Sequence, residues 1–169
     1  VKEAAQQIEN LTGIKRSLTD GGIRVPLLAR WPAKIKPGAV SDHVSGFQDL
    51  LPTVAELSGA ELKVPTDGIS FVPTLTNNGK QVAHDHLYWN FDEQGGKRAV
   101  LQWPWKLIHL NTGTERNKTK NKSKPKPLEV QLFNLDEDIA EQNNVADQHP
   151  ELVKQLEAKM MAAWQEPKL

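Results

Sequence analysis

Four runs in the second half of the chain are rich in apolar and aromatic residues, and the longer ones alternate apolar with polar positions. This period of two is typical of half-buried β-strands. The runs cover residues 84–91, 98–102, 105–110 and 128–135. Glycine or proline residues separate the first three runs, which favours turns between antiparallel neighbours. The pattern therefore predicts a small four-stranded antiparallel sheet.

Residues 150–165 follow a helical period instead. Their charged side chains, Lys154, Glu157 and Lys159, lie away from a stripe of apolar residues that recur every three or four positions. We expect this stripe to bury against the predicted sheet as core. It consists of Leu152, Val153, Leu156, Met160 and Trp164.

A second amphipathic helix is predicted over residues 49–59. Asp49 stands at a position typical of an N-cap, and Gly59 is a natural C-terminal stop. Residues 1–11 show a weaker helical pattern, and residues 64–75 indicate a loop followed by a short turn. The apolar side of the 49–59 helix is formed by Leu50, Leu51, Val54 and Leu57.

One segment of the first half combines a lysine, an acidic residue and a glycine pair. Lys15 stands ahead of Asp20, and Gly21-Gly22 follows at once. A glycine pair permits positive φ angles or the close approach of another stretch of chain. The next run, 23–29, predicts a short strand leaving this turn. Lys15 is then either an ordinary solvated lysine or a positive charge that projects into a cleft at the strand's end.

Three histidines are candidates for a site. His43 precedes the 49–59 helix, where a hydrogen-bonded structural histidine is favoured over a cleft residue. His84 and His86 would project from the same face of the first predicted strand, with Asp85 on the other. A metal site is not favoured there, because a third ligand is not near in sequence.

Two charged stretches complete the picture. Residues 115–127 carry five lysines and one arginine against one glutamate, a net charge of about +5, without an apolar residue. A solvated loop is favoured, and attraction of a polyanion such as a sulfated glycan is the alternative. Aromatic residues for base stacking are not interleaved. We interpret the acidic residues at 136–141 as turn and cap groups, because they lack the spacing of a calcium loop.

Composition excludes several classes of protein. The 169 residues carry 21 basic and 21 acidic side chains, so the net charge is about zero. Overall charge therefore does not favour binding to nucleic acid or to a membrane surface. Cysteine is absent, which excludes disulfides and a thiol nucleophile within these residues. The sequence begins at Val1 without an initiating methionine or a signal-peptide pattern. We expect it to be a fragment.

Several of these stretches resemble the type I sulfatases of the alkaline-phosphatase-like superfamily. Residues 13–26 are similar to that family's G-x-K-x-x-x-x-[E/D]-G-G-x-R-V-P segment. Residues 84–89 look like its H-D-x-L-Y-W phrase, followed by Asn90 where glutamate is usual. Residues 132–146 look like L-[YF]-[DN]-L-x-x-D-P-x-E-x-x-N-x-A, with Ile139 in place of the proline. The motifs occur in the family's order.

The resemblance implies an α/β (α+β) fragment. Residues 1–80 would be the C-terminal part of the sulfatase α/β catalytic domain. Residues 81–169 would form a small C-terminal subdomain, a four-stranded antiparallel sheet with a packed C-terminal helix. The partner of the chain would be the missing N-terminal half of the sulfatase, and its location would be periplasmic or secreted.

The same resemblance implies a chemistry. Lys15 occupies the position of the lysine that contacts the substrate sulfate in the family, as a catalytic and substrate-binding residue, and His84 fits a histidine near the family's cleft. Calcium and a formylglycine nucleophile serve the family's reaction, but the C/S-x-P-x-R motif and the aspartates that hold calcium are not in this sequence. We therefore expect sulfate ester hydrolysis by the parent protein, on aryl or carbohydrate sulfates, and inactivity of this chain alone.

Two alternatives remain open. The first is a non-catalytic binding module that holds a sulfated glycan or another polyanion through Lys15 and the 116–126 loop. The second is a phosphatase or phosphonate hydrolase of the same superfamily, which the segment from Lys15 to Pro26 disfavours.

Overall fold

The computed structural model of the chain describes residues 10–113 and 126–164. They divide into two compact units. The first joins Val1–Pro26 to His86–Leu169, and the second is Leu27–Asp85. Residues 10–26 thus pack with the C-terminal half, whereas the sequence interpretation grouped them with everything up to residue 80. The assignment of residues 1–80 to a larger catalytic domain stays a prediction.

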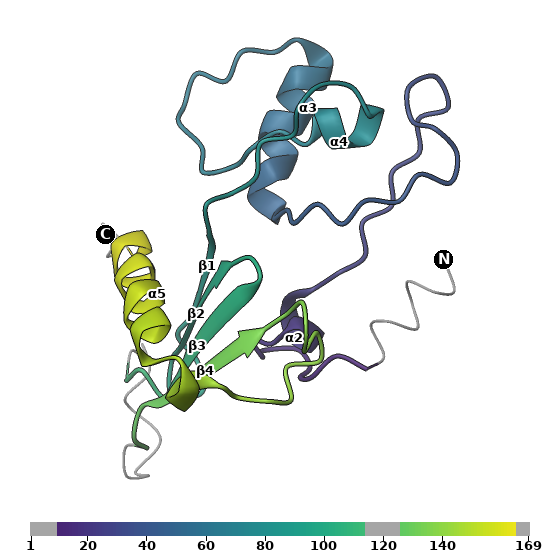
Figure 1. The fold of residues 1–169 in the computed structure, drawn as a ribbon. Helices are drawn as coiled ribbons and strands as arrows, with labels where there is room; N and C mark the ends of the chain where they lie inside the picture. Colours follow the sequence, from purple (N-terminus) through teal and green to yellow (C-terminus); the bar gives the residue numbers. More distant parts are fainter. Residues whose placement is uncertain (1–9, 114–125, 165–169) are drawn as a thin grey trace. The chain divides into compact units, whose positions relative to one another are not determined.

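The first unit contains the predicted antiparallel sheet, with its strands in sequence order (Figure 1). Its first strand is shorter than predicted: it begins at Leu87, so His84 and His86 precede it and do not share one of its faces. In register, Ala99 lies opposite Ile108, and Leu107 opposite Leu132. The strands are β1 Leu87–Phe91, β2 Lys97–Gln102, β3 Trp105–Leu110 and β4 Glu129–Asn134.

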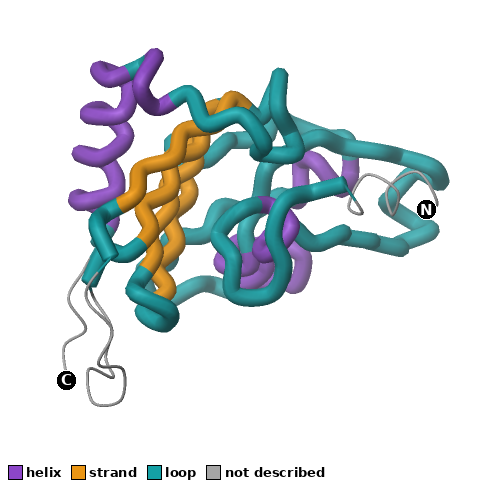
Figure 2. Tube along the Cα trace, turned by 90° about the horizontal axis from the view of Figure 1, so that it is seen from below, coloured by secondary structure: helices purple, strands orange, loops and turns teal. Residues whose placement is uncertain are grey.

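Helix α5, Pro150–Ala163, lies alongside the strands and covers one face of the sheet (Figure 2). Burial of each large apolar side chain in such a core contributes roughly 1.5–3 kcal/mol. The predicted packing of the C-terminal helix on the sheet is thereby confirmed. Trp164 lies beyond the helix end in extended backbone, where its ring stacks 4.9 Å from the Arg98 guanidinium. The fully buried cluster consists of Val100, Leu107, Leu132, Leu156 and Met160.

The other face of the sheet is covered by the segment that contains α2, Asp20–Ile23 (Figure 1). The strand predicted for 23–29 is wrong, because α2 ends at Ile23 and residues 24–32 are exposed without regular pairing. The glycine pair serves close approach and not a positive φ. A Cβ on Gly21 would lie 2.4 Å from the Gly13 carbonyl oxygen, and one on Gly22 would lie 2.4 Å from that of Ser17.

The second unit is built around α3, Leu50–Ser58, which follows the 3-10 turn Phe47–Asp49. Gly59 ends the helix with a φ of 70°, as predicted. Helix α4, Val72–Thr76, joins α3 through Phe71, whose N–H donates to Thr53 Oγ1 at 3.0 Å. The apolar stripe of α3 is not covered by the described residues. Its members are exposed by 40% at Leu50, 54% at Leu51, 60% at Val54 and 40% at Leu57.

A partly buried histidine of β3, which contacts α5, makes the stability of the first unit depend on pH. His109 Nε2 lies 3.1 Å from Glu157 Oε1. Burial lowers the pKa of His109 below its ordinary 6.5, Glu157 opposes this shift, and Arg98 adds to it. The unfolded chain therefore binds the proton more readily than the folded chain does.

We expect the free energy of unfolding to fall as the pH drops below about 6.5, because the unfolded state takes up this proton first. His109→Gln should flatten that part of the profile. Glu157→Gln should steepen it, because the carboxylate that favours the imidazolium is lost. Urea unfolding followed between pH 5 and pH 8 measures both slopes, and an unchanged slope in His109→Gln would contradict the assignment.

Candidate functional site

Lys15 lies in a tight turn of the first unit. The Ser17 N–H donates to the Ile14 carbonyl oxygen at 2.8 Å, so that Lys15 and Arg16 are the two central residues. Arg16 has a φ of 75°, the angle that a type II turn requires at its third position. Glycine usually occupies that position, and another residue there costs on the order of 1–3 kcal/mol. The turn leaves the Lys15 side chain exposed to solvent.

A buried cluster of charges follows this turn. Lys106 Nζ lies 2.6 Å from Asp20 Oδ1 and 2.8 Å from Glu141 Oε1, and the side chains of Lys106 and Glu141 are both 0% exposed. The Asp20 backbone N–H donates to the second oxygen of Glu141. The guanidinium of Arg24 lies 3.3 Å from Asp20 Oδ2, which gives the aspartate a second cation. Two cations and two carboxylates thus balance.

Burial raises the pKa of Glu141, and the Lys106 ammonium opposes this rise. A buried ammonium is costly unless its charge is matched and its protons are bonded, and here two carboxylates meet both needs. Because Lys106 has no exposed surface, it cannot touch a substrate. The role of the cluster is therefore to hold the chain around Asp20 in place.

The sequence interpretation missed this cluster. It assigned no role to Lys106 within the predicted strand 105–110, and its assignment of Glu141 as a turn or cap group is wrong. A lysine inside a strand that is buried on both faces was the available signal, since such a lysine needs an acidic partner. For Asp138 the cap assignment is confirmed, because its carboxylate accepts the N–H groups of Gln142 and Asn143.

The second unit places a histidine against a buried carboxylate. His84 Nε2 lies 2.8 Å from Asp49 Oδ1. Asp49 is 0% exposed and also accepts the N–H groups of Gly46 at 2.7 Å and Ile69 at 2.8 Å. The predicted N-cap role is corrected: Asp49 precedes α3, but its side chain bonds these groups and not the first turn of α3.

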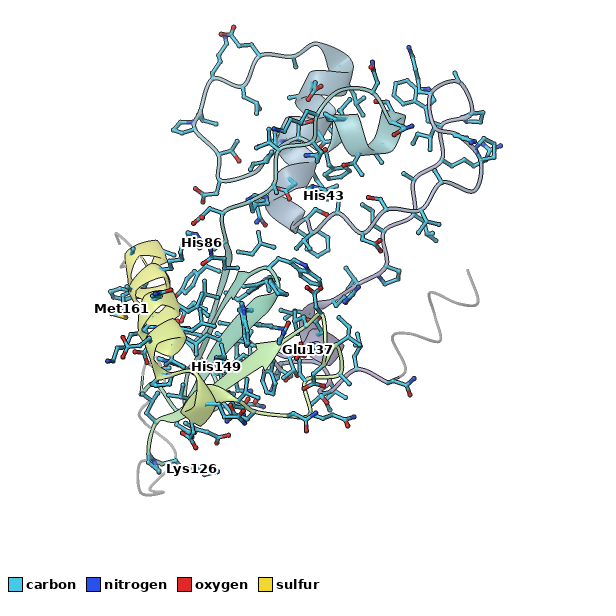
Figure 3. All side chains as sticks on the ribbon, viewed as in Figure 1. His43, His86, Lys126, Glu137, His149 and Met161 are labelled. Atoms are coloured by element: carbon cyan, nitrogen blue, oxygen red, sulfur yellow. The ribbon has the colours of Figure 1, made fainter. Side chains whose placement is uncertain are left out.

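His43 lies near the beginning of α3 (Figure 3). Burial lowers the pKa of His43, the Asp49 carboxylate opposes this shift, and His84 adds to it. An ionised carboxylate only accepts hydrogen bonds, so His84 donates through Nε2 and keeps Nδ1 for another partner. An imidazole oriented in this way can accept a proton at Nδ1, and as the imidazolium it can donate from Nδ1 to an anion.

A shallow polar hollow adjoins β3 and the chain before α5, where Figure 3 labels Glu137 and His149. Trp105 also lines it, with its ring 5.0 Å from that of His149 and its other contacts against the core cluster. Within 10–113 and 126–164, no three acidic or histidine side chains are arranged to hold a metal ion.

The two predicted substrate-binding residues belong to different units: Lys15 to the first and His84 to the second. Most of the basic stretch 116–126, through residue 125, lies outside the described residues, as does most of the helix predicted over 1–11. Among the helices that the structure describes, none is long and apolar enough to cross a membrane.

Comparison with protein families identifies the class of the chain. The model of a family described as N-sulphoglucosamine sulphohydrolase, C-terminal, matches residues 14–166. The match covers the Lys15 turn, the buried cluster, both histidines of the second unit and the whole sheet. The chain belongs to this family of sulfatase C-terminal regions.

Individual relatives agree with this assignment. The chain is 34% identical to arylsulfatase A of Bos taurus over 160 residues, which cover 85% of this chain and 31% of that protein. It is 38% identical over 74 residues to an ulvan-active sulfatase of Formosa agariphila, covering 44% of this chain and 15% of that protein. The chain thus spans about a third of the length of the curated relatives it matches, or less.

Solved structures support the fold. The structure named Ps i-CgsB, in complex with a neocarrahexaose, matches 90% of this chain and 31% of its own with a TM-score of 0.69 and 26% identity. A sulfatase structure from work on glycosaminoglycan metabolism by Bacteroides thetaiotaomicron matches 91% of this chain and 32% of its own, with a TM-score of 0.64 and 26% identity. These neighbours have the alkaline-phosphatase-like fold of sulfatases, which confirms the predicted fold class.

We expect Lys106→Met to lower the free energy of unfolding by about 3–5 kcal/mol, because two buried carboxylates lose their shared cation. Adding Glu141→Gln should recover part of this loss. Lys154→Met is the matched control, since it removes an exposed lysine 2.8 Å from Glu151 and should cost under about 0.5 kcal/mol. Urea denaturation at pH 7 measures all three. Equal effects of the two lysine substitutions would refute the cluster's role in stability.

Proposed function

We propose that this chain is the C-terminal part of a sulfatase that hydrolyses sulfate esters of aryl or carbohydrate type, in which Lys15 contacts the sulfate. The observation that carries the proposal is the Lys15 turn. It presents an exposed ammonium within the family's G-x-K segment, next to a segment anchored by buried charges. Relatives of the chain are sulfatases, and they supply the reaction class.

The chemistry suits a lysine. Negative charge builds on the sulfate oxygens and on the leaving oxygen as the sulfuryl group is transferred, so a fixed ammonium favours the transition state. His84, oriented by Asp49, is the second proposed substrate-side residue, through its remaining ring nitrogen. Lys15 can be removed without emptying a core because it is exposed, whereas the His84 side chain is 10% exposed and bonded to the buried Asp49.

Calcium and formylglycine serve the family, and in this proposal both belong to other parts of the protein. The sequence has no cysteine, and the described residues do not gather a set of carboxylates for a metal. We therefore assign this chain no step that involves either group. Its part is to bind and orient the sulfate.

The uncovered stripe on α3 supports a further part of the proposal. Leu51 and Val54 are exposed by 54% and 60%. Such exposure is unusual for an amphipathic helix, whose apolar side normally faces a core. We propose that this stripe packs against the remainder of a sulfatase catalytic domain. The share of the relatives' length that the chain spans leaves room for such a part.

We expect the chain alone, incubated with calcium and a chromogenic aryl sulfate, to show no turnover above a Lys15→Ala control. In a form that includes the upstream catalytic residues, Lys15→Ala should lower kcat/KM about 100-fold or more, because a charge contact to the transferring group is lost. Lys154→Ala is the control for loss of an exposed lysine. Turnover by the chain alone, or full activity of Lys15→Ala in the longer form, would overturn the proposal.

A glycan-binding module is the second candidate, favoured by the net charge of about +5 on residues 115–127. Binding of such a stretch to heparin should weaken steeply with salt, because counterions are released. Salt-dependent heparin binding by the chain, lost when the loop lysines are neutralised, together with an unaffected Lys15→Ala enzyme, would favour this candidate over the sulfatase proposal.

A further inference from the structure

We propose that Lys97 and Lys106 are positioning residues for Lys15: these two sheet lysines hold, at two points, the turn that presents it. This inference rests on the proposed role of Lys15 in sulfate contact. It adds a function for the small sheet, which then sets where the substrate-binding ammonium lies. The two points are the Arg16 carbonyl oxygen and the Asp20 carboxylate.

The first point of attachment is Arg16, within the turn itself. Arg16 keeps a φ of 75°, and such a conformation persists in a non-glycine residue only when its surroundings hold it. Lys97 Nζ donates to the Arg16 carbonyl oxygen at 2.7 Å and to Gln94 Oε1 at 2.8 Å. Its ammonium also lies 5.6 Å from the centre of the Phe91 ring. Lys97 is thus itself fixed by the β1–β2 hairpin.

The same hairpin supplies a weaker contact to the turn. Glu93 Oε2 lies 3.7 Å from the Arg16 guanidinium, with both side chains more than half exposed. Exposed pairs of this kind contribute little. The hydrogen bond from Lys97 is therefore the main contact that holds the turn at Arg16, since it binds the carbonyl group of the strained residue directly.

The second point is Asp20. Its carboxylate is held by Lys106 at 2.6 Å and its N–H by Glu141. The chain that carries the two points is closed on itself: the Gly21 N–H donates to the Thr12 carbonyl oxygen at 2.9 Å on either side of them, and Ser17 Oγ lies 2.6 Å from Thr19 Oγ1 between them. A short closed loop tied to a sheet at both points has little freedom to move Lys15.

Packing alone does not account for a lysine at position 106. Its neighbour Ile108 and its cross-strand partner Leu101 are apolar and buried, so an apolar side chain would suit that face. A charge is costly there, and replacement of buried ion groups by apolar ones is often neutral or stabilising. An ammonium, unlike a methyl group, requires carboxylate partners, here Asp20 and Glu141, and so fixes the position of the Asp20 segment.

The first experiment uses the chain itself and measures amide hydrogen exchange by NMR. Lys97→Met should raise the exchange rate of the Ser17 amide about tenfold, because the hydrogen bond that closes the turn opens more often. The Leu107 amide, in the middle of the sheet, should keep its rate. Lys154→Met is the matched control and should change neither. An unchanged Ser17 rate in Lys97→Met would overturn the proposal.

The second experiment is a double-mutant cycle on sulfate ester turnover in the active form of the protein. Lys97→Met should lower kcat/KM about tenfold in the presence of Lys15 and should have no further effect in Lys15→Ala, because it acts through that residue. An effect of equal size in both backgrounds would show a merely structural role and refute positioning. If Lys15→Ala alone leaves kcat/KM unchanged, the proposed function fails instead.

A third experiment tests whether Lys106 holds the Asp20 segment in place. Lys106→Met with Asp20→Asn and Glu141→Gln removes the charges together, which keeps the fold from carrying an unmatched carboxylate. We expect this triple variant to remain folded by circular dichroism and still to show faster exchange at the Gly21 amide. Exchange at the rate of the unmodified chain would refute the role of Lys106 in holding the turn.

Discussion

A lysine enclosed on every side is the constraint from which the arrangement of the first unit follows. Lys106 is the second residue of β3, it lies beside the buried side chains of Leu101 and Ile108, and its ammonium has no access to water. An unmatched charge in that place would cost several kcal/mol. The cost is offset because Asp20 and Glu141, from opposite ends of the sequence, both reach it. The sheet, the segment around Asp20 and the turn that contains Glu141 are therefore joined by electrostatics as well as by packing.

This constraint also explains how the two faces of the sheet differ. The face under α5 is an ordinary apolar core, formed by side chains such as Leu107, Leu132 and Leu156. The opposite face, under the segment that contains α2, is also largely apolar, with Leu101, Ile108 and Phe133 buried. Lys106 is a buried charged residue on that face, and its ion pairs determine where the Asp20 segment lies. In the proposed function this segment adjoins the turn that presents the Lys15 ammonium.

The second unit shows the same principle on a smaller scale. Asp49 is fully buried and accepts two backbone N–H groups and the ring of His84. It thereby ties the beginning of α3 to the chain near Ile69 and to the end of the unit. The apolar side of α3 takes no part in this organisation and lies exposed. In a family whose curated members are much longer, such a surface is where we propose that further parts of the protein pack.

Periodicity in the sequence was sufficient to determine the sheet and the two longer helices, because the alternation of apolar and polar residues is a local property. Strands β2 to β4 and helix α5 begin and end within a residue or two of their predicted limits. The family motifs, also local, placed the chain among the sulfatases and singled out Lys15. The sequence could not indicate that Gly21 and Gly22 serve close backbone contacts, because a glycine pair is equally compatible with positive φ angles.

The partners of charged residues were decided only by the tertiary structure. Lys106 and Glu141 are far from Asp20 along the chain, and their pairing depends on which face of the sheet the N-terminal segment covers. For the same reason Lys97 could not be linked to Arg16, nor Asp49 to His84, from spacing. Local patterns indicate which side chains share a face of a strand or helix. The partner of a buried charge depends on how distant segments pack together in the whole fold.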